Sequence, residues 1–496
     1  MQDAGRIRDD LTGLLGPSRL ADDATTARAW RDTWVISVWR SLGDAPPPRP
    51  ACVVRPQATS EVSAVLRYAS RERIPVVPFG AGSGVCGAIL APPSSIVLDL
   101  GAMRSLLGID EQALLATAQP GLLGSDFEAA LNAAGFSMGH FPQSIALSSL
   151  GGWVATRSAG QFSTKYGNIE DLFVAFEAVL PSGAVIRTRP VPRAAIGPDL
   201  RHLFLGAEGT TGVLTELTFQ IHPLPEATGK QAYAFPSMRA GLEALRRTLR
   251  AGWRPAVLRL YDAIEAGRSF SGAAKPEESL LLALTEGPAA LVEAELAALA
   301  ASCRLAGGRA IGPEAVESWL VHRNTVPEFE FFLNQGMVVD TIEVATRWNR
   351  IDELYEGVLA RVRQVPGVIV VSGHSSHSYA TGTNIYFTFA ARPDRPDDLE
   401  ALYFRIWDAA MEATLAADGT VSHHHGIGRV RRGWLERELG SAYPLLGTLK
   451  NALDPLGIMN PGALLPAPGE PAAANAFPPA DAPRAADPAG PGSDTA

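Results

Sequence analysis

The sequence predicts a mixed α+β protein made of two successive α/β units, the second of them an open antiparallel sheet covered by helices. Three observations predict this fold class. The chain has 496 residues, which is too long for one hydrophobic core. Short apolar runs alternate with helical patterns through both halves, as in layered sheet-and-helix folds. Hydrophobic residues make up 46% of the chain and charged residues 19%, so large cores can be buried.

The first half is expected to begin with a helical segment, residues 1–47, that ends at the prolines 46–48. The runs at 96–100 and 173–180 are rich in Val, Leu and Phe and indicate buried strands. The second half alternates strand-like runs with helical patterns, which predicts a sheet with helices on one face. The expected strands are 256–261, 279–284, 368–371 and 384–389, and the expected helices are 289–301, 350–362 and 399–416.

These patterns divide the chain into five segments. They are an N-terminal helical segment (1–47), a first α/β domain (48–225), a second domain (226–420), a C-terminal segment (421–465) and a tail (466–496). The tail is rich in Ala, Pro, Gly and Asp and is expected to be disordered, because it has too little apolar surface to bury.

Charge and composition exclude several classes of partner and compartment. The formal net charge is -9, so a nucleic-acid partner is not expected, whereas a small anionic substrate needs only a few local cations. The three cysteines have neither metal-site spacing nor a disulfide pattern, which favours a reducing, cytoplasmic setting. No signal-peptide core or membrane-spanning run is expected. Peripheral contact with lipid stays open, as does a homodimer.

A glycine-rich loop at residues 78–87 carries the first functional signal. Gly82 to Gly87 satisfy the GxGxxG spacing, but two prolines at 92–93 and the strand-like run at 96–100 follow, where a dinucleotide-binding Rossmann site needs a helix. A glycine loop between two strands can still bind a pyrophosphate through its backbone N–H groups. An ordinary glycine-rich turn is the alternative.

Two further tracts, residues 139–160 and 206–214, are unusually rich in Gly, Ser, Thr and Ala. A protein core does not tolerate so many small residues unless something else fills the space, and a large bound cofactor would do so. Together the three tracts resemble the PCMH-type FAD-binding domain of the vanillyl-alcohol-oxidase superfamily, over about residues 48–225. This resemblance implies FAD as the cofactor, and it implies two α/β subdomains in the first domain and a cap domain that covers the flavin.

The resemblance carries over to residues that would wrap the pyrophosphate, line the isoalloxazine and ribityl chain, and complete the adenine side. His140 lies where some members of the superfamily attach the flavin covalently. The resemblance described in the next paragraph implies non-covalent binding, and we expect FAD to be bound non-covalently here. The implied FAD-binding residues are Pro78, Phe79, Gly80, Ala81, Gly82, Ser83, Gly84, His140, Pro142, Gln143, Ser144, Ile145, Ala146, Leu147, Ser148, Thr156, Arg157, Ser158, Ala159, Glu208, Gly209, Thr210, Thr211, Gly212, Val213 and Leu214.

Within that superfamily the chain resembles the alkyldihydroxyacetonephosphate synthases. Tyr-Gly-Asn-Ile-Glu-Asp-Leu at 166–172 and Ser-His-His-His-Gly-Ile-Gly at 422–428 look like two blocks of that family. The similarity covers about residues 48–465 and is patchy between 265 and 340. It implies exchange of the acyl chain of acyl-dihydroxyacetone phosphate for a fatty alcohol, with a small anionic substrate that carries an acyl chain.

The resemblance also assigns substrate-binding and catalytic residues. Tyr386 matches the family's substrate tyrosine, and Arg259 matches an arginine suited to a phosphate or carboxylate. A structural ion pair with Asp262 or Glu343 is the alternative for Arg259, because an arginine in an apolar strand needs an anionic partner. His423, His424 and His425 are expected to bind phosphate and move protons, since three consecutive side chains diverge too far to ligate one metal. A polar loop at a domain junction is their alternative.

One position departs from the synthase pattern. His374 stands where the animal synthases carry a substrate arginine, so a titratable group replaces a permanent cation. His374 and His377 are potential metal ligands, but the longer pattern of metal-dependent relatives is absent and no metal is expected. The departure keeps a second function open, the FAD-linked oxidation of a D-2-hydroxy acid of the glycolate or lactate type, and a non-catalytic flavin-binding protein is a third hypothesis.

Overall fold

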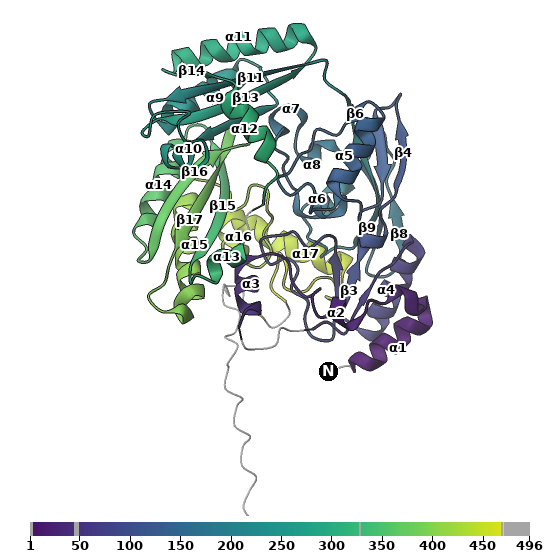
Figure 1. The fold of residues 1–496 in the computed structure, drawn as a ribbon. Coiled ribbons are helices and arrows are strands. Elements are labelled where there is room, and N and C mark those ends of the chain that lie inside the picture. The colour runs from purple at the N-terminus through teal and green to yellow at the C-terminus, as the bar shows by residue number, and fades with distance from the viewer. Residues whose placement is uncertain (1–2, 44–48, 327–328, 468–469, 471–496) are drawn as a thin grey trace, which may run out of the picture.

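The computed structural model describes residues 3–43, 49–326, 329–467 and 470. The prolines 46–48 and nearly all of the predicted tail lie outside the described residues. Figure 1 shows two halves side by side, with the N-terminal helices below and the yellow C-terminal segment between the halves. Among the described helices, none has the length and apolar character needed to cross a membrane.

The N-terminal segment packs against both halves of the molecule. It contains α1 (Ala4–Leu15), the short 3-10 helix η1 (Pro17–Arg19), α2 (Asp23–Thr26) and α3 (Val35–Ser41). Ile7 and Leu11 of α1 are buried in the core of the first half. The indole Nε1 of Trp34, just before α3, donates to the Tyr403 hydroxyl of the second half at 2.9 Å.

The first half consists of two small sheets with their helices. A parallel sheet of order β1-β3-β2 is joined by the crossover helix α4, and the glycine loop follows β2 directly. A five-stranded antiparallel sheet of order β4-β5-β9-β7-β8 forms the second subdomain. The predicted strands at 96–100 and 173–180 are confirmed as β3 and β7. The elements are β1 (Cys52–Val54), α4 (Thr59–Glu72), β2 (Val76–Phe79), β3 (Ile96–Asp99), η2 (Leu100–Ala102), β4 (Leu106–Asp110), β5 (Leu115–Ala118), α5 (Gly124–Ala133), β6 (Phe136–Ser137), α6 (Leu150–Thr156), α7 (Ser163–Tyr166), α8 (Ile169–Leu172), β7 (Phe173–Val179), β8 (Val185–Arg187), η3 (Leu200–Leu203), β9 (Val213–Gln220) and β10 (His222–Pro223).

The second half is an open, seven-stranded antiparallel sheet of order β14-β11-β13-β12-β16-β17-β15, as predicted for the cap. All four predicted strands and all three predicted helices are present, whereas β11, β14 and β15 were not predicted. The elements are β11 (Ala227–Phe235), α9 (Met238–Arg250), β12 (Val257–Tyr261), α10 (Ala263–Ser269), β13 (Ser279–Gly287), α11 (Ala289–Leu305), β14 (Arg309–Gly312), α12 (Glu314–His322), α13 (Phe329–Leu333), β15 (Val338–Arg347), α14 (Ile351–Arg363), β16 (Val368–Ser375), β17 (Gly382–Ala391), η4 (Pro396–Asp398) and α15 (Leu399–Ala416).

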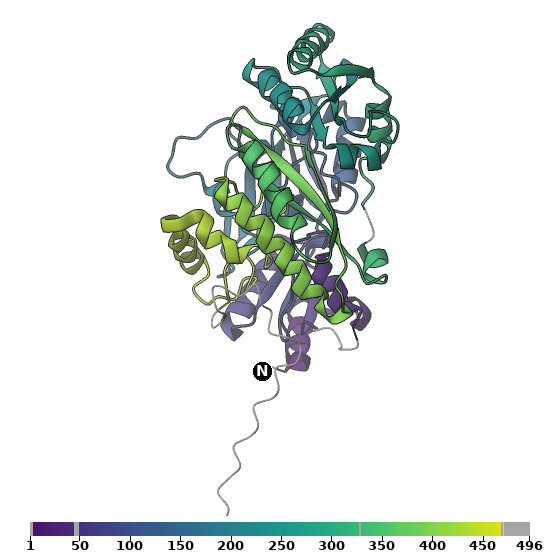
Figure 2. The ribbon, with the colours of Figure 1, turned by 90° about the vertical axis from the view of Figure 1, so that its left-hand side faces the viewer.

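The helices α9, α11, α14 and α15 pack on one face of this sheet, and Figure 2 shows α14 and α15 lying across it. Successive strand residues point to opposite faces. Leu258 and Leu260 are fully buried in the core with those helices, so Arg259 between them faces the other half. The same alternation directs Tyr386 toward the other half, because Ile385 and Phe387 belong to the helix-covered core. Burying each such Leu or Phe contributes roughly 1.5–3 kcal/mol, which fixes the register.

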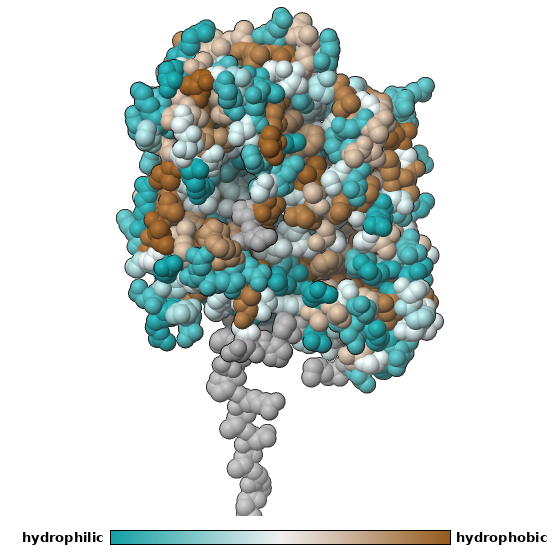
Figure 3. Space-filling model, viewed as in Figure 1, coloured by the Kyte–Doolittle hydropathy of each residue, from teal (hydrophilic) through white to brown (hydrophobic). Residues whose placement is uncertain are grey.

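The C-terminal segment returns from the cap to the first half. It contains α16 (Arg432–Leu439), η5 (Gly440–Ala442) and α17 (Tyr443–Leu453). Beyond α17, the backbone N–H of Val76 in β2 donates to the Ile458 carbonyl at 2.8 Å. On the face seen in Figure 3, hydrophobic residues are scattered among hydrophilic ones.

Candidate active site

A cavity of about 1240 Å³ lies between the glycine-rich tracts of the first half and the strand face of the cap. It is larger than the 300–1,000 Å³ typical of a small-ligand site, so it has room for a dinucleotide and a substrate. The predicted residues that line it are Pro78, Phe79, Gly80, Ala81, Gly82, Ser83, Gly84, Pro142, Gln143, Ser144, Leu147, Ser148, Thr156, Ser158, Ala159, Glu208, Gly209, Thr211, Gly212, Val213, Leu214, Arg259, His374, Tyr386, His424 and His425.

Six predicted site residues are not part of the cavity wall: His140, Ile145, Ala146, Arg157, Thr210 and His423. Arg157 ends α6 in the left-handed conformation and pairs with Glu170 at 2.9 Å, away from the cavity. His140 is buried behind Ser158, with its Nε2 2.9 Å from the serine hydroxyl. Burial lowers the pKa of His140 to about 3. The geometry of His140 fits a supporting role, and non-covalent binding of FAD stays a prediction.

The loop after β2 fits a pyrophosphate by its backbone. Gly82 has a φ of +71°, and a Cβ added there would lie 2.7 Å from the Phe79 ring, so only glycine suits this position. A Cβ on Gly80 would clash with the Ser149 hydroxyl. Among the described residues, the N–H groups of 81–84 have no protein acceptor. Unpaired N–H groups on a glycine loop form the concave donor array that binds phosphate oxygens.

Two buried carboxyl groups lie at this end of the cavity; Glu208 was predicted as a site residue, whereas Asp32 was not. Asp32, from the N-terminal segment, accepts from the Trp34 N–H at 3.1 Å, and burial raises its pKa to about 7. Glu208 accepts from the N–H groups of Ile427 at 2.6 Å and Gly428 at 3.0 Å. Burial also raises the pKa of Glu208 to about 7. Glu208 therefore ties the third glycine tract to the loop that follows the histidine triplet.

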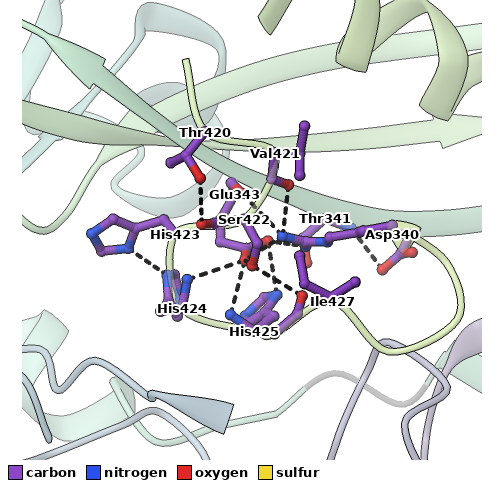
Figure 4. Close-up of polar contacts among 12 residues, drawn as sticks. Asp340, Thr341, Glu343, Thr420, Val421, Ser422, His423, His424, His425 and Ile427 are labelled. Atoms are coloured by element: carbon purple, nitrogen blue, oxygen red, sulfur yellow. Dashed lines mark hydrogen bonds and ion pairs between the residues drawn. The ribbon is translucent and has the colours of Figure 1, made fainter. Parts of the chain in front are cut away.

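The histidine triplet wraps around a buried carboxylate, as Figure 4 shows. Glu343, on β15, accepts from the backbone N–H groups of His424 at 3.3 Å and His425 at 2.9 Å. Its other partners are the Nδ1 of His425 at 3.1 Å and the guanidinium of Arg431. Burial alone would raise the pKa of Glu343, but Arg431 and His425 hold it well below its usual range. An ionised, fully buried glutamate thus positions the loop.

A chain of hydrogen bonds leads from the cavity to half-buried residues through the triplet. His424 lines the cavity, and its Nδ1 is 2.8 Å from the Nδ1 of His423. The Nε2 of His423 is 2.7 Å from the Tyr379 hydroxyl, which also contacts the amide of Asn168 at 2.9 Å. Burial lowers the pKa of His423 to about 4 and that of His424 well below its usual range. Both imidazoles are therefore neutral near pH 7.

Arg259 and His374 form a second group on the same sheet face. Arg259 donates from Nη2 to the Nε2 of His374 at 2.8 Å and from Nε to the Tyr261 hydroxyl at 2.8 Å. The Nδ1 of His374 faces Glu265 at 3.1 Å, so these partners assign its proton to Nδ1. Among the described residues, no carboxylate lies within ion-pair distance of Arg259. The alternative of a structural ion pair is thereby removed, since Asp262 bonds to Tyr355 and the Gly373 N–H instead.

Tyr386 lies between the two groups. Its ring centroid is 4.9 Å from that of His374, 5.6 Å from that of His425 and 5.9 Å from that of His424. Burial raises the pKa of its hydroxyl, which is therefore a phenol at neutral pH. His377 also lines the cavity, with its Nδ1 2.9 Å from the Ser163 hydroxyl. Within the described part of the chain, no group of three or more His, Cys, Asp or Glu side chains has the arrangement of a metal site.

The cavity is also lined by two groups of residues that no local pattern marked as site residues: Arg31, Asp32 and Thr33, and then Ser318, Trp319, His322 and Arg323. The first group comes from the loop before α3, and the second comes from the end of α12 and the turn after it. A loop that enters a site from elsewhere in the chain leaves no signal in its own residue spacing.

Comparison with known proteins identifies the family. Residues 50–189 match the FAD binding domain family, and residues 224–464 match the C-terminal domain of FAD linked oxidases. An uncharacterized FAD-linked oxidoreductase, YgcU, of Escherichia coli K12 is 35% identical over 93% of this chain and 98% of its own length. The alkyldihydroxyacetonephosphate synthase of Trypanosoma brucei brucei is 30% identical over 93% of this chain and 80% of its own.

Two further similarities concern a second activity and a solved structure. The glycolate oxidase subunit GlcD of Bacillus subtilis is 26% identical over 92% of this chain and 96% of its own length. A solved alkyldihydroxyacetonephosphate synthase structure has a TM-score of 0.79 at 25% identity and covers 93% of this chain and 85% of its own. FAD is therefore the cofactor, and the matched FAD binding domain contains the first two glycine-rich tracts. The chain belongs to the FAD-linked oxidase family, as an FAD-dependent enzyme whose homologues include the alkyldihydroxyacetonephosphate synthases.

Proposed function

We propose that this enzyme exchanges the acyl chain of an anionic acyl ester such as acyl-dihydroxyacetone phosphate for a fatty alcohol, which yields an ether and releases the acyl chain as a fatty acid. The supporting observation is that Arg259, a cation without a carboxylate partner, and an apolar wall share one cavity. The apolar wall consists of Val38, Val85, Ile89, Phe332 and Val339.

Strand pairing relates the apolar wall to the polar group. Glu343 pairs in register with Tyr386, and Val339 precedes it by four residues on β15. At about 3.4 Å per residue, Val339 is about 14 Å along the strand from Tyr386. That separation suits a substrate with an anionic group at one end and an alkyl chain at the other.

In this proposal FAD supplies the redox-active ring, and the protein groups bind the substrate and move its protons. Arg259 binds the anionic group. Tyr386, a phenol at neutral pH, donates a hydrogen bond to a substrate oxygen. His424 accepts the proton that the alcohol loses, and His423 and Tyr379 carry it away from the cavity. A neutral imidazole has an unprotonated ring nitrogen that can receive this proton.

A second candidate function is the oxidation of a D-2-hydroxy acid. His374 favours it, because a neutral imidazole bonded to Glu265 stands where the synthases carry a second substrate cation. In that reaction Arg259 would bind the carboxylate and His424 would take the hydroxyl proton. The similarity to a glycolate oxidase subunit agrees with this candidate.

One pair of assays separates the two functions. Holoenzyme with palmitoyl-dihydroxyacetone phosphate and labelled hexadecanol is expected to form labelled ether, and without oxygen D-lactate or glycolate is expected to leave the flavin absorbance unchanged. A His424→Gln variant is expected to lose exchange, and His202→Gln, at an exposed histidine, serves as its control. Bleaching by a hydroxy acid without ether formation would replace the first function by the second.

A further inference from the structure

A second arginine enters the cavity from the region that sequence patterns left unassigned. Arg323 follows α12 of the cap but is fastened to the first half. Its Nη1 donates to the Gln161 Oε1 at 2.9 Å, and the Gln161 amide donates back to the Arg323 carbonyl at 3.0 Å. The Gln143 amide donates to the Thr325 carbonyl at 2.6 Å. Three hydrogen bonds with Gln143, in the second glycine-rich tract, and Gln161, just after it, thus fix this turn over the cavity.

The Arg323 guanidinium is surrounded by aromatic rings and has no carboxylate partner. It lies 4.8 Å from the ring centroid of Phe141, 5.0 Å from that of Phe162 and 5.8 Å from that of Trp319. Among the described residues, no carboxylate lies within ion-pair distance of it. The carboxylates of Glu128 and Glu286 act on it only at longer range. Burial lowers its pKa to about 10, so it remains charged at neutral pH.

Trp319 connects the two unpaired arginines. The Arg259 guanidinium is 5.5 Å from the Trp319 ring centroid, and all three residues line the cavity. A third arginine of this wall, Arg268, pairs with Glu265 at 3.1 Å, and Glu265 also pairs with His374. At this end of the wall, three arginines therefore face one carboxylate, Glu265, and only Arg268 of the three pairs with it. Desolvated cations without a counter-charge are costly, so this end of the cavity is built for negative charge from a ligand.

We propose that Arg259 and Arg323 form a two-cation subsite around Trp319 that selects a substrate with a dianionic end over one with a single negative charge. A phosphate monoester and a pair of carboxylates share this chemistry. The inference deepens the proposed function and rests on it only in taking this cavity as the substrate site. It assigns Arg323 as a substrate-binding residue whichever of the two reactions the enzyme performs.

The test is a titration of the holoenzyme at pH 8 and low ionic strength, followed by the change in flavin absorbance. The ligands are sn-glycerol 3-phosphate, malonate and acetate, which present a phosphate dianion, two carboxylates and one carboxylate. Wild-type protein is expected to bind a dianion at least tenfold more tightly than acetate. Arg323→Gln is expected to weaken binding of that dianion about tenfold, the loss of one charge-assisted contact, and to change acetate binding less than threefold.

Arg309→Gln is the matched control, because Arg309 pairs with Glu278 at 2.9 Å on the cap surface. The proposal is overturned if Arg323→Gln binds the preferred dianion as tightly as this control. It is also overturned if wild-type protein binds neither dianion more tightly than acetate, a comparison that needs no variant to fold. A preference for glycerol phosphate over malonate, or the reverse, tells whether the dianionic end of the substrate is a phosphate or a pair of carboxylates. Dianion selectivity without ether formation would leave this subsite standing and remove only the exchange reaction.

Discussion

The two histidine groups on the cap side of the cavity differ in where their hydrogen bonds end. His374 lies in a closed set, with Arg259 on one ring nitrogen and Glu265 on the other. His423 and His424 lie in an open chain that continues through Tyr379 to Asn168, both half-buried. A closed set fixes a charge in place, whereas an open chain lets a proton leave the site. The difference suggests that one group binds the substrate and the other serves the chemistry.

The largest effect on stability is expected from Glu343→Gln, because Glu343 holds the histidine triplet of the open chain in place. The change leaves the buried guanidinium of Arg431 without its carboxylate and is expected to destabilise the protein by about 3–5 kcal/mol. Urea unfolding of the holoenzyme measures this loss. Glu353→Gln is the control, because its side chain is half exposed and the change is expected to cost at most about 1 kcal/mol. A loss below 1 kcal/mol for Glu343→Gln would show that the triplet loop does not depend on this glutamate.

The next effect concerns pH. Burial depresses the pKa of His423 from 6.5 to about 4, so the folded protein binds fewer protons there than the unfolded chain. The stability that depends on neutral His423 is present above pH 6.5 and is lost as pH falls toward 4. At 1.36 kcal/mol per pKa unit the loss is roughly 3 kcal/mol. His423→Gln is expected to lack this loss. The difference in free energy of unfolding between wild type and His423→Gln, measured by urea unfolding, should therefore shrink as pH falls from 6.5 to 4. A difference that does not change with pH would contradict the lowered pKa of His423.

The parts of this site that the sequence predicts are those whose signal is local. The three glycine tracts stand out by composition, and Arg259 stands out as a charge in an apolar strand. Glu343 was considered only as a partner for Arg259, because the strand β15 carries Asp340 and Glu343 among its apolar residues and was not recognised as a strand. Arg323 has no local signal at all, since its role depends on Gln161, which is 162 residues away in the chain. Contacts between segments that are distant in the chain depend on how the two halves pack together. The local spacing of residues therefore does not reveal them.

A smaller effect is expected from Tyr379→Phe, which interrupts the open chain without altering the cavity wall. The change removes the hydroxyl between His423 and Asn168, so turnover is expected to fall about 10- to 100-fold while KM is unchanged. Tyr68→Phe is the control, because its hydroxyl bonds to Asp10 in the N-terminal segment at 2.9 Å. Steady-state rates of whichever reaction the assays identify provide the measurement. Turnover equal to that of the control would mean that protons leave by another path.

The smallest effect on anion binding is expected from a change at Arg268, beside the closed set of Arg259, His374 and Glu265. It tests whether Glu265 neutralises the charge of Arg268. Arg268 pairs with Glu265, but about half of its side chain is exposed, and Glu265 keeps His374 as a partner. Arg268→Gln is therefore expected to weaken anion binding by less than about 1 kcal/mol, well below the effect of Arg259→Gln. Titration of both variants with sn-glycerol 3-phosphate compares them directly. If Arg268→Gln cost as much as Arg259→Gln, the charge of Arg268 would reach the ligand, and Glu265 would not be neutralising it as the distances indicate.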